Sequence, residues 1–390
     1  MELAYSGKIA ESEILKTLPV SQFSSSIKEN KNLLIQGDNL EALRNLLHNY
    51  NLKGKIDLIY IDPPFATNGT FTINSERTST ISSSKSDDVA YTDTLLGDEF
   101  IEFIRERLII ARELLSEQGS IYLHIDYKIG HYVKIIMDEI FGIENFRNDI
   151  TRIKCNPKNF SRKAYGNIKD LILFYSKSKN PIWNEPFQAF SEDDKIRLYK
   201  KIDSNGRFYT TVPLHAPGET KDGVTGGMFK GMFPPKGRHW RTSPAELEKL
   251  DEQNLIEWSK NGVPRRKIYA DEQKGKKVQD IWDFKDYQYP VYPTEKNLDL
   301  LKLIVKTSSN PESIVMDFFC GSGTTLVAAQ ELGRKWIGID KSIKAIEVAE
   351  KKLCGGKDLF SNDIQLIELK NLENESVRKN VIKKSVAESA

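Results

Sequence analysis

The chain has 390 residues, of which 39% are hydrophobic and 29% are charged, and its formal net charge is +2. These values are typical of a globular protein with one large domain or two moderate ones. Three cysteines without a CxxC pair and five scattered histidines without an HExxH motif give no support to a disulfide framework or to a zinc or iron site. The first residues lack the apolar core of a signal peptide and no stretch is apolar enough to span a bilayer, so we expect a cytoplasmic protein with reduced thiols.

Strands and helices alternate in the first third of the chain. Residues 1–30 are polar and rich in serine, which indicates a loose N-terminal arm. A short buried strand over 33–35 leads to Asp38 and Asn39, either of which can cap a following helix with leucines on one face. The next strand covers 56–61. The order strand, helix, strand predicts a parallel sheet and an α/β fold.

The strand over 56–61 runs directly into Asp62-Pro63-Pro64-Phe65. Neither proline can donate to a sheet ladder, so the chain must leave the sheet in a stiff, extended turn. The turn presents a carboxylate and an aromatic ring at the carboxyl end of a strand, where open α/β sheets bind ligands. Taken alone, these four residues are equally compatible with an ordinary strand-ending turn.

Two later segments differ from the elements around them. Residues 66–94 are dominated by Thr, Ser, Asn and Gly, and their place directly after Phe65 favours a lid over a ligand pocket. Residues 151–180 contain eight Lys or Arg and one Asp, which indicates either a solvated face or a surface for phosphates. Around them, the periodicity predicts helices over 98–116 and 129–141 and strands over 120–125 and 168–175.

The alternation stops from about 180 to 285. Prolines, glycines, aromatic and basic residues interleave there, which predicts an inserted, irregular module with a short helix over 243–250. Beyond it the alternation returns, and the tail from about 370 is charged and expected to be frayed. The elements expected in this last part are a helix after Thr294-Glu295-Lys296, a strand over 313–317, a helix over 325–332, a strand over 335–339 and a helix over 342–353.

A glycine-containing turn, residues 318–325, joins the strand and helix of this last part. Its glycines allow a ligand to approach the backbone beneath the positive end of a helix, and Asp340 ends the next strand where a carboxylate commonly takes ribose hydroxyls. No lysine follows Gly323, so the turn is not a P-loop, and Leu326 stands where a dinucleotide fingerprint has its third glycine. A nucleoside ligand without phosphates, such as S-adenosylmethionine, remains.

The two motifs together, Asp62-Pro63-Pro64-Phe65 and Asp317-Phe318-Phe319-Cys320-Gly321-Ser322-Gly323-Thr324-Thr325, resemble the signature of the amino-methyltransferases of DNA. The catalytic motif comes first and the cofactor motif last, as in the β class, which includes type II adenine methylases and type III modification (Mod) subunits. The resemblance covers residues 31–355. It departs from the family at Phe65, where tyrosine is commoner. The implied fold is a circularly permuted, Rossmann-like S-adenosylmethionine-dependent methyltransferase fold with an inserted target-recognition module.

The resemblance also implies a division of the chain. It consists of an N-terminal arm (1–30), a catalytic half of the methyltransferase domain (31–179, with the lid loop 66–94), a target-recognition or DNA-binding module (180–285), a cofactor-binding half (286–355) and a C-terminal tail (356–390).

The same resemblance assigns roles to residues. Asp62 and the carbonyl of Pro63 would accept hydrogen bonds from the target amino group on the stiff turn that Pro64 completes, and Phe65 would stack on the base. The sulfonium is a sufficient leaving group, so no metal is required. The cofactor residues would be Asp38, Thr294, Glu295, Lys296, Asp317, Phe318, Phe319, Gly321, Gly323, Thr324 and Asp340.

The implied function is methyl transfer from S-adenosylmethionine to adenine N6 in double-stranded DNA after base flipping. One alternative is cytosine N4, although related cytosine enzymes usually carry Ser-Pro-Pro. Another is a DNA-binding specificity protein with a decayed active site, and a nicotinamide oxidoreductase is more distant. We further expect a homodimer and a place at the nucleoid of a bacterial or archaeal cell, and any ATP-driven restriction subunit would be a separate chain.

Overall fold

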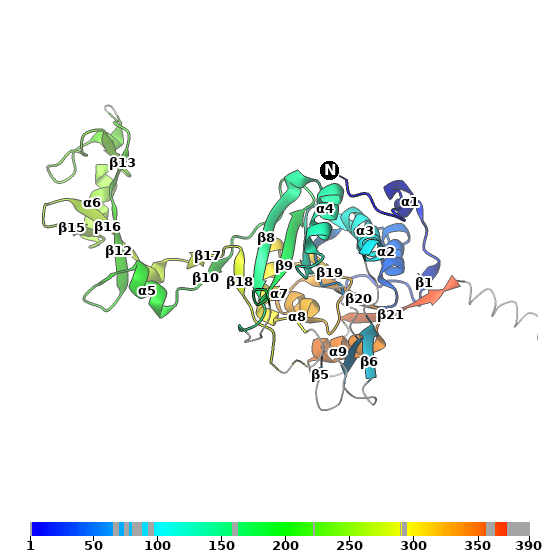
Figure 1. Ribbon diagram of the computed structural model, residues 1–390. Helices are drawn as coiled ribbons and strands as arrows, with labels where there is room; N and C mark the ends of the chain where they lie inside the picture. Colours follow the sequence, from blue (N-terminus) through cyan, green and yellow to red (C-terminus); the bar gives the residue numbers. More distant parts are fainter. Residues whose placement is uncertain are drawn as a thin grey trace, which may run out of the picture. The chain divides into compact units, whose positions relative to one another are not determined.

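The computed structural model describes residues 2–64, 70–73, 78–79, 88–92, 97–157, 163–220, 223–288, 290, 295–355 and 363–372. The chain forms two compact units (Figure 1). The large unit consists of Met1–Glu185 and Gln279–Ala390, and the small unit of Pro186–Val278. The small unit therefore begins and ends inside the segment where strand–helix alternation stops.

Among the described residues of the large unit, ten strands form one sheet. In spatial order they are β1 (Ser21–Phe23), β21 (Ile364–Asn371), β2 (Asn32–Gln36), β20 (Lys335–Asp340), β19 (Ile314–Asp317), β3 (Ile56–Ile61), β7 (Leu115–Ile125), β9 (Lys169–Ser176), β8 (Phe146–Ile153) and β18 (Ile281–Asp283). Within the run from β21 to β7, every adjacent pair of strands is parallel, whereas β1 is antiparallel to β21 and β9 is antiparallel to both β7 and β8. The predicted α/β fold with a parallel sheet is confirmed.

Helices cover both faces of this sheet, which explains why its central strands are apolar along their length. All residues of β3 are buried except Asp57, and β19 and β20 are buried almost throughout. Figure 1 shows two groups of helices on different sides of the strands. One group is α1 (Glu11–Lys16), α2 (Asn39–His48), α3 (Gly97–Leu114) and α4 (Gly130–Phe141), and the other is α7 (Leu298–Ser308), α8 (Thr324–Glu331) and α9 (Ile343–Cys354).

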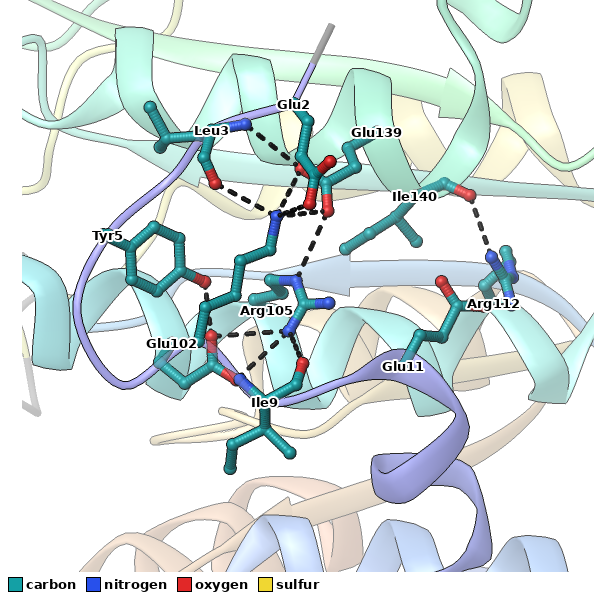
Figure 2. A network of polar contacts seen from close by, with 11 residues as sticks. Glu2, Leu3, Tyr5, Ile9, Glu11, Glu102, Arg105, Arg112, Glu139 and Ile140 are labelled. Atoms are coloured by element: carbon teal, nitrogen blue, oxygen red, sulfur yellow. Dashed lines mark hydrogen bonds and ion pairs between the residues drawn. The ribbon is translucent and has the colours of Figure 1, made fainter.

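Residues 1–30 are not the loose arm expected from their composition. β1 pairs antiparallel with β21, and the residues before α1 contact α3 and α4 through a polar network (Figure 2). Arg105, buried in α3, pairs with Glu102 at 3.1 Å, and Lys8 pairs with Glu139 of α4 at 2.8 Å. The polar composition of this segment suggested that it is solvated, but its polar side chains take part in these ion pairs. The segment is therefore fixed on α3 and α4.

The expectation of a frayed C-terminal tail is also partly wrong. Residues 364–371 form β21, which lies inside the sheet between β1 and β2. Its alternating burial, with Gln365 and Ile367 inward, is that of a strand with one covered face. Residues 356–362 and 373–390 lie outside the described part.

The expected lid over 66–94 contains three short strands, β4 (Thr70–Ile73), β5 (Thr78–Ser79) and β6 (Asp88–Thr92), which form an antiparallel sheet. The other residues of this segment, and Phe65 just before it, lie outside the described residues. Whether the segment covers a pocket therefore stays a prediction.

The small unit is built mostly from short antiparallel strands. Its four-stranded sheet has the order β11 (Lys201–Ile202), β12 (Phe208–Pro213), β16 (Pro264–Tyr269) and β15 (Ile256–Trp258). Two further pairs are β10 (Phe187–Gln188) with β17 (Lys276–Lys277) and β13 (His215–Pro217) with β14 (Arg238–Trp240). The unit also contains α5 (Glu192–Leu198) and α6 (Pro244–Glu252), and it has its own buried cluster of Leu214, Phe229, Trp240, Leu247, Leu250 and Ile256.

Candidate active site

Three acidic residues stand at the carboxyl ends of neighbouring strands. Asp62 follows β3, Asp317 ends β19, and Asp340 ends β20. Because these strands are adjacent and parallel, their carboxyl ends meet at one edge of the sheet, where α/β sheets bind ligands. The two motifs that lie far apart in the sequence are therefore brought together.

A cavity of about 490 Å³ lies at this edge. Most of the residues singled out from the sequence line it: Asp38, Asp62, Pro64, Glu295, Lys296, Asp317, Phe318, Phe319, Gly321, Thr324 and Asp340. Pro63 and Gly323 lie in the same turns but do not line the cavity. Phe65 and Thr294 lie outside the described residues.

The Asp62 carboxylate has one oxygen in an ion pair and one oxygen without a donor. Its Oδ2 lies 2.5 Å from the Nζ of Lys296, and both side chains are largely buried. Its Oδ1 is buried and has no hydrogen-bond partner among the described residues. A buried acceptor without a donor costs about 1–3 kcal/mol, so Asp62 is suited to accept a hydrogen bond from a ligand in the cavity.

Asp317 anchors the glycine-containing turn from within. Its Oδ1 accepts a hydrogen bond from the backbone N–H of Phe319 at 3.0 Å, and the Thr325 hydroxyl donates to its Oδ2 at 2.6 Å. The side chain is almost fully buried, and burial raises the pKa of Asp317 from 3.8 to about 7 despite these two bonds.

This raised pKa predicts a pH-dependent stability. The unfolded chain releases the Asp317 proton near pH 3.8, whereas the folded protein holds it to about pH 7, so the free energy of unfolding falls as pH rises through this range. The total loss is about 4 kcal/mol. We expect Asp317→Asn, which cannot ionise, to lack this loss in urea unfolding at pH 5 and pH 8. Identical pH dependence in both proteins would contradict the assignment.

Asp340 binds the backbone on both sides of the cavity edge. Its Oδ2 accepts from the N–H of Gly321 at 2.9 Å, and its Oδ1 accepts from the N–H of Ser342 at 2.8 Å. Burial raises the pKa of this carboxyl group. Because a carboxylate oxygen has two acceptor sites, each oxygen can still accept from a hydroxyl group of a ligand.

The turn between β19 and α8 depends on two glycines. Gly321 and Gly323 have φ of 48° and 78°, in the left-handed region that favours glycine. A Cβ at Gly323 would also lie 2.9 Å from the Cβ of Ala349. No side chain among the described residues caps the amino end of α8, so its N–H groups and positive dipole end lie beside the cavity, which Thr324 lines.

Two cavity residues, Asn39 and Arg107, were missed as site residues. Asn39 Nδ2 donates to the carbonyl of Phe318 at 2.7 Å, and Arg107 Nε donates to Asn39 Oδ1 at 2.7 Å. Burial lowers the pKa of Arg107 to about 10, and its guanidinium lies 3.5 Å from the ring centre of Phe103. Asp38 caps α2 through the N–H groups of the next turn. The available signal was an arginine inside the apolar face of the helix over 97–114.

A series of hydrogen bonds that sequence reasoning missed begins at the cavity and runs into the interior of the large unit. Tyr60 lines the cavity, and its hydroxyl lies 2.9 Å from Nδ1 of His124. The other ring nitrogen of His124 lies 3.3 Å from Asp170, to which Lys154 donates at 2.7 Å. Burial acts to raise the pKa of Asp170, but the bonds from His124 and Lys154 outweigh it and lower the pKa. The Asp170 carboxylate thus holds the Nε2 proton, and Tyr60 donates to Nδ1.

The sequence places the chain in one family. Residues 56–351 match the family model described as DNA methylase, so the chain belongs to this family. It is a DNA methyltransferase of the kind found in restriction–modification systems, with S-adenosylmethionine as methyl donor. The predicted family, enzyme class, Rossmann-like methyltransferase fold and cofactor are confirmed.

Two relatives that are similar in sequence agree with this assignment, and one solved structure is similar to part of the chain. The chain is 43% identical over 369 residues to the type II methyltransferase M.EcaI of Enterobacter cloacae. The aligned region covers 91% of this chain and 78% of that protein. It is 29% identical over 354 residues to the Mod subunit of the type III restriction–modification enzyme StyLTI of Salmonella typhimurium, covering 80% of this chain and 52% of that subunit. It thus spans about half the length of this Mod subunit. A crystal structure of an M1.HpyAVI–SAM complex is 18% identical, with a TM-score of 0.45, and covers 82% of this chain and 100% of that one.

Two further observations concern the described part of the chain. No group of three His, Cys, Asp or Glu side chains there is arranged to hold a metal ion. Every helix there is too short or too polar to cross a membrane.

Proposed function

We propose that the protein transfers a methyl group from S-adenosylmethionine to the N6 amino group of adenine in double-stranded DNA, as the modification component of a restriction–modification system. The observation that carries the proposal is the buried Oδ1 of Asp62 at the cavity, which has no donor among the described residues. It stands on a proline turn, beside the glycine-containing turn of the cofactor motif. A positioned acceptor is what an exocyclic amino group requires.

The chemical difficulty is that the lone pair of an amino group on a base is delocalised into the ring. When bound, the cofactor supplies an electrophilic methyl group on a sulfonium. Asp62 Oδ1 accepts a hydrogen bond from one amino hydrogen, and the Pro63 carbonyl accepts from the other, which localises the lone pair on nitrogen. Pro64 and Pro63 keep this pair of acceptors stiff, so little free energy is lost in orienting them. Phe65 supplies a flat ring on which the flipped base stacks.

We assign the cofactor to the residues beside the glycine-containing turn. Asp340 accepts from the ribose hydroxyls with the acceptor sites that Gly321 and Ser342 leave open. The remaining assigned residues surround the amino-acid portion, the ribose and the adenine edge: Asp38, Thr294, Glu295, Lys296, Asp317, Phe318, Phe319, Gly321, Gly323 and Thr324. Lys296 contacts Asp62 as well, so it stands between the cofactor residues and the acceptor for the target base.

Cytosine N4 is the second candidate target, because the matched family model is named for both N6 and N4 methylation. Asp62 favours adenine, since related cytosine enzymes usually have serine at this position. Nucleoside mass spectrometry of DNA from a host that expresses the protein distinguishes the two. We expect N6-methyladenine that is absent from the same host with an empty vector. N4-methylcytosine without N6-methyladenine would overturn the adenine assignment.

The proposal includes an assembly and a location. By analogy with the β class, we propose that the protein is a homodimer and that any restriction subunit is a separate chain. We also propose that the protein is cytoplasmic and associates with the nucleoid. Sedimentation equilibrium of the purified protein, with and without duplex DNA, tests the dimer, and a monomeric mass at micromolar concentration would remove it.

A further inference from the structure

We propose that the paired strands β13 and β14 of the small unit, together with the adjoining start of β16, form a surface that holds duplex DNA through the guanidinium groups of Arg238, Arg241 and Arg265. This inference rests on the proposed function, because it assigns the nucleic-acid substrate to particular residues. It also distinguishes three basic residues of the small unit from the basic run at 151–180.

Three cations of the basic run at 151–180 are committed to internal contacts. Arg152 is fully buried and forms an ion pair with Asp286. Lys154 donates to Asp170, and Lys177 donates to the carbonyl of Leu115 at 2.7 Å. These three cations cannot turn to phosphates without leaving buried groups unpaired, so their role is structural.

Two other cations of the small unit, Arg207 and Lys230, are already paired with carboxylates. Arg207 forms a two-pronged contact with Asp271 at 2.8 and 2.9 Å and reaches Glu272 at 2.7 Å. Lys230 pairs with Asp251 at 2.6 Å. A charge already paired in this way gains little from an added phosphate.

The three arginines of the proposed surface differ, because their contacts among the described residues are to neutral groups. Arg238 Nη1 lies 3.1 Å from Nδ1 of His215. Arg241 Nε donates to the carbonyl of Pro213 at 3.2 Å, and Arg265 donates twice to Thr211, at 2.9 and 2.8 Å. These bonds fix each guanidinium while leaving other N–H donors without a carboxylate.

Strand pairing gathers these charges at one place. Pro213 of β12 pairs with Arg265 of β16. In the neighbouring pair of strands, His215 of β13 pairs with Trp240 of β14, which directly precedes Arg241, and Pro217 pairs with Arg238. The pKa of His215 is lowered first by burial and then by the positive charges of Arg238, Arg241 and Arg265, in agreement with this strand pairing. Like charges held together repel one another, so an anion that binds here removes an existing cost.

The backbone of the hairpin is anchored in the core of the small unit, which keeps the arginine side chains in fixed positions. Trp240 is 2% exposed, belongs to the core of the small unit and donates through Nε1 to the carbonyl of Gly227 at 2.9 Å. Phe229 is fully buried in the same core. A fixed backbone lets planar guanidinium groups present parallel donors to phosphate oxygens or to a guanine edge.

The loop of the hairpin also exposes apolar side chains. Val224, Met228 and Phe233 are 75%, 54% and 65% exposed, although Phe229 between them is buried. Exposed apolar side chains beside arginines with neutral partners suit a duplex, because apolar residues can enter a base step while cations hold the flanking phosphates. We therefore commit to duplex DNA, with an anionic membrane surface as the alternative outcome of the test.

The test is duplex binding by the full-length protein. The probes are a duplex with the motif found methylated in host DNA, a scrambled duplex, and vesicles of phosphatidylglycerol and phosphatidylcholine. For Arg238→Ala, Arg241→Ala and Arg265→Ala we expect about 5- to 50-fold weaker binding and a salt slope reduced by about 1 for each phosphate that the variant no longer binds. Arg207→Ala, the matched control from the same unit, should bind within about twofold of the wild type, and all four variants should melt like the wild type.

Methyl-transfer kinetics separate this inference from the proposed function. We expect the three arginine variants to have a raised KM for DNA and unchanged affinity for S-adenosylmethionine, because the cofactor residues lie in the large unit. If the wild type methylates DNA but the folded variants bind duplex as tightly as it does, or if the surface binds vesicles and not duplex, the hairpin inference is wrong and the function stands. If duplex binding depends on the hairpin but no methyl group is transferred, the proposed function fails and the hairpin inference stands.

Discussion

Asp62→Ala should lower the rate of methyl transfer to DNA by at least about 10²–10³-fold, the cost of removing one group that acts in a transition state. The substitution removes the acceptor whose Oδ1 lies buried without a donor among the described residues, and it takes away the carboxylate that lies 2.5 Å from the Lys296 ammonium. Single-turnover transfer of a labelled methyl group to duplex DNA measures the effect. Because Asp62 contacts the target base and not the cofactor in this account, the affinity for S-adenosylmethionine should change less than about tenfold.

A matched control lies on β3, the strand that directly precedes Asp62. Asp57 in β3 accepts a hydrogen bond from Ser116 at 2.8 Å and does not line the cavity, so Asp57→Asn should leave the transfer rate unchanged. Asp62→Asn keeps the size of the side chain and loses its charge, and it should also be strongly impaired. A folded Asp62→Ala protein with more than about a tenth of the wild-type rate would remove Asp62 from the chemistry.

Asp340→Ala should weaken binding of S-adenosylmethionine by about 10- to 100-fold, since a hydrogen bond to a charged group contributes about 1.5–3 kcal/mol. Both oxygens of Asp340 are already oriented by backbone N–H groups, at 2.9 and 2.8 Å, so the ribose meets a fixed acceptor. Isothermal titration of the cofactor into the protein measures the loss. Asp340→Asn keeps one oxygen and should be affected less.

The control for this prediction is Asp299→Asn, an exposed acid in the first turn of α7 that does not line the cavity. It should bind the cofactor like the wild type. If Asp340→Ala folds and binds S-adenosylmethionine with wild-type affinity, the ribose does not contact Asp340, and the cofactor assignment along β20 has to be abandoned.

The centre of the fold was predictable because its signals are local. A run of apolar β-formers followed by two prolines defines the end of β3, and a strand followed by Gly321 and Gly323 defines the turn into α8. Each of these signals depends on a few adjacent residues, and the parallel order then brings the two motifs to one edge of the sheet. For the same reason the candidate cofactor residues of the glycine-containing turn could be named in advance.

The parts that sequence reasoning missed depend on contacts between distant segments. β1 and β21 pair Ser21 with Asn371, and neither strand has a strong pattern of its own. Arg107 and Asn39 are polar residues that become cavity residues because α3 crosses beside the start of α2. His124 reads as an isolated histidine in an apolar strand until Tyr60 and Asp170 are brought to its two nitrogens.

The most direct test of the central claim is modification-aware sequencing of DNA from a host without other methylases, expressing either the wild type or Asp62→Ala. We predict N6-methyladenine at one short sequence motif with the wild type and its loss with Asp62→Ala at equal protein level. Methylation of cytosine N4 instead of adenine, or undiminished adenine methylation with Asp62→Ala, would contradict the account.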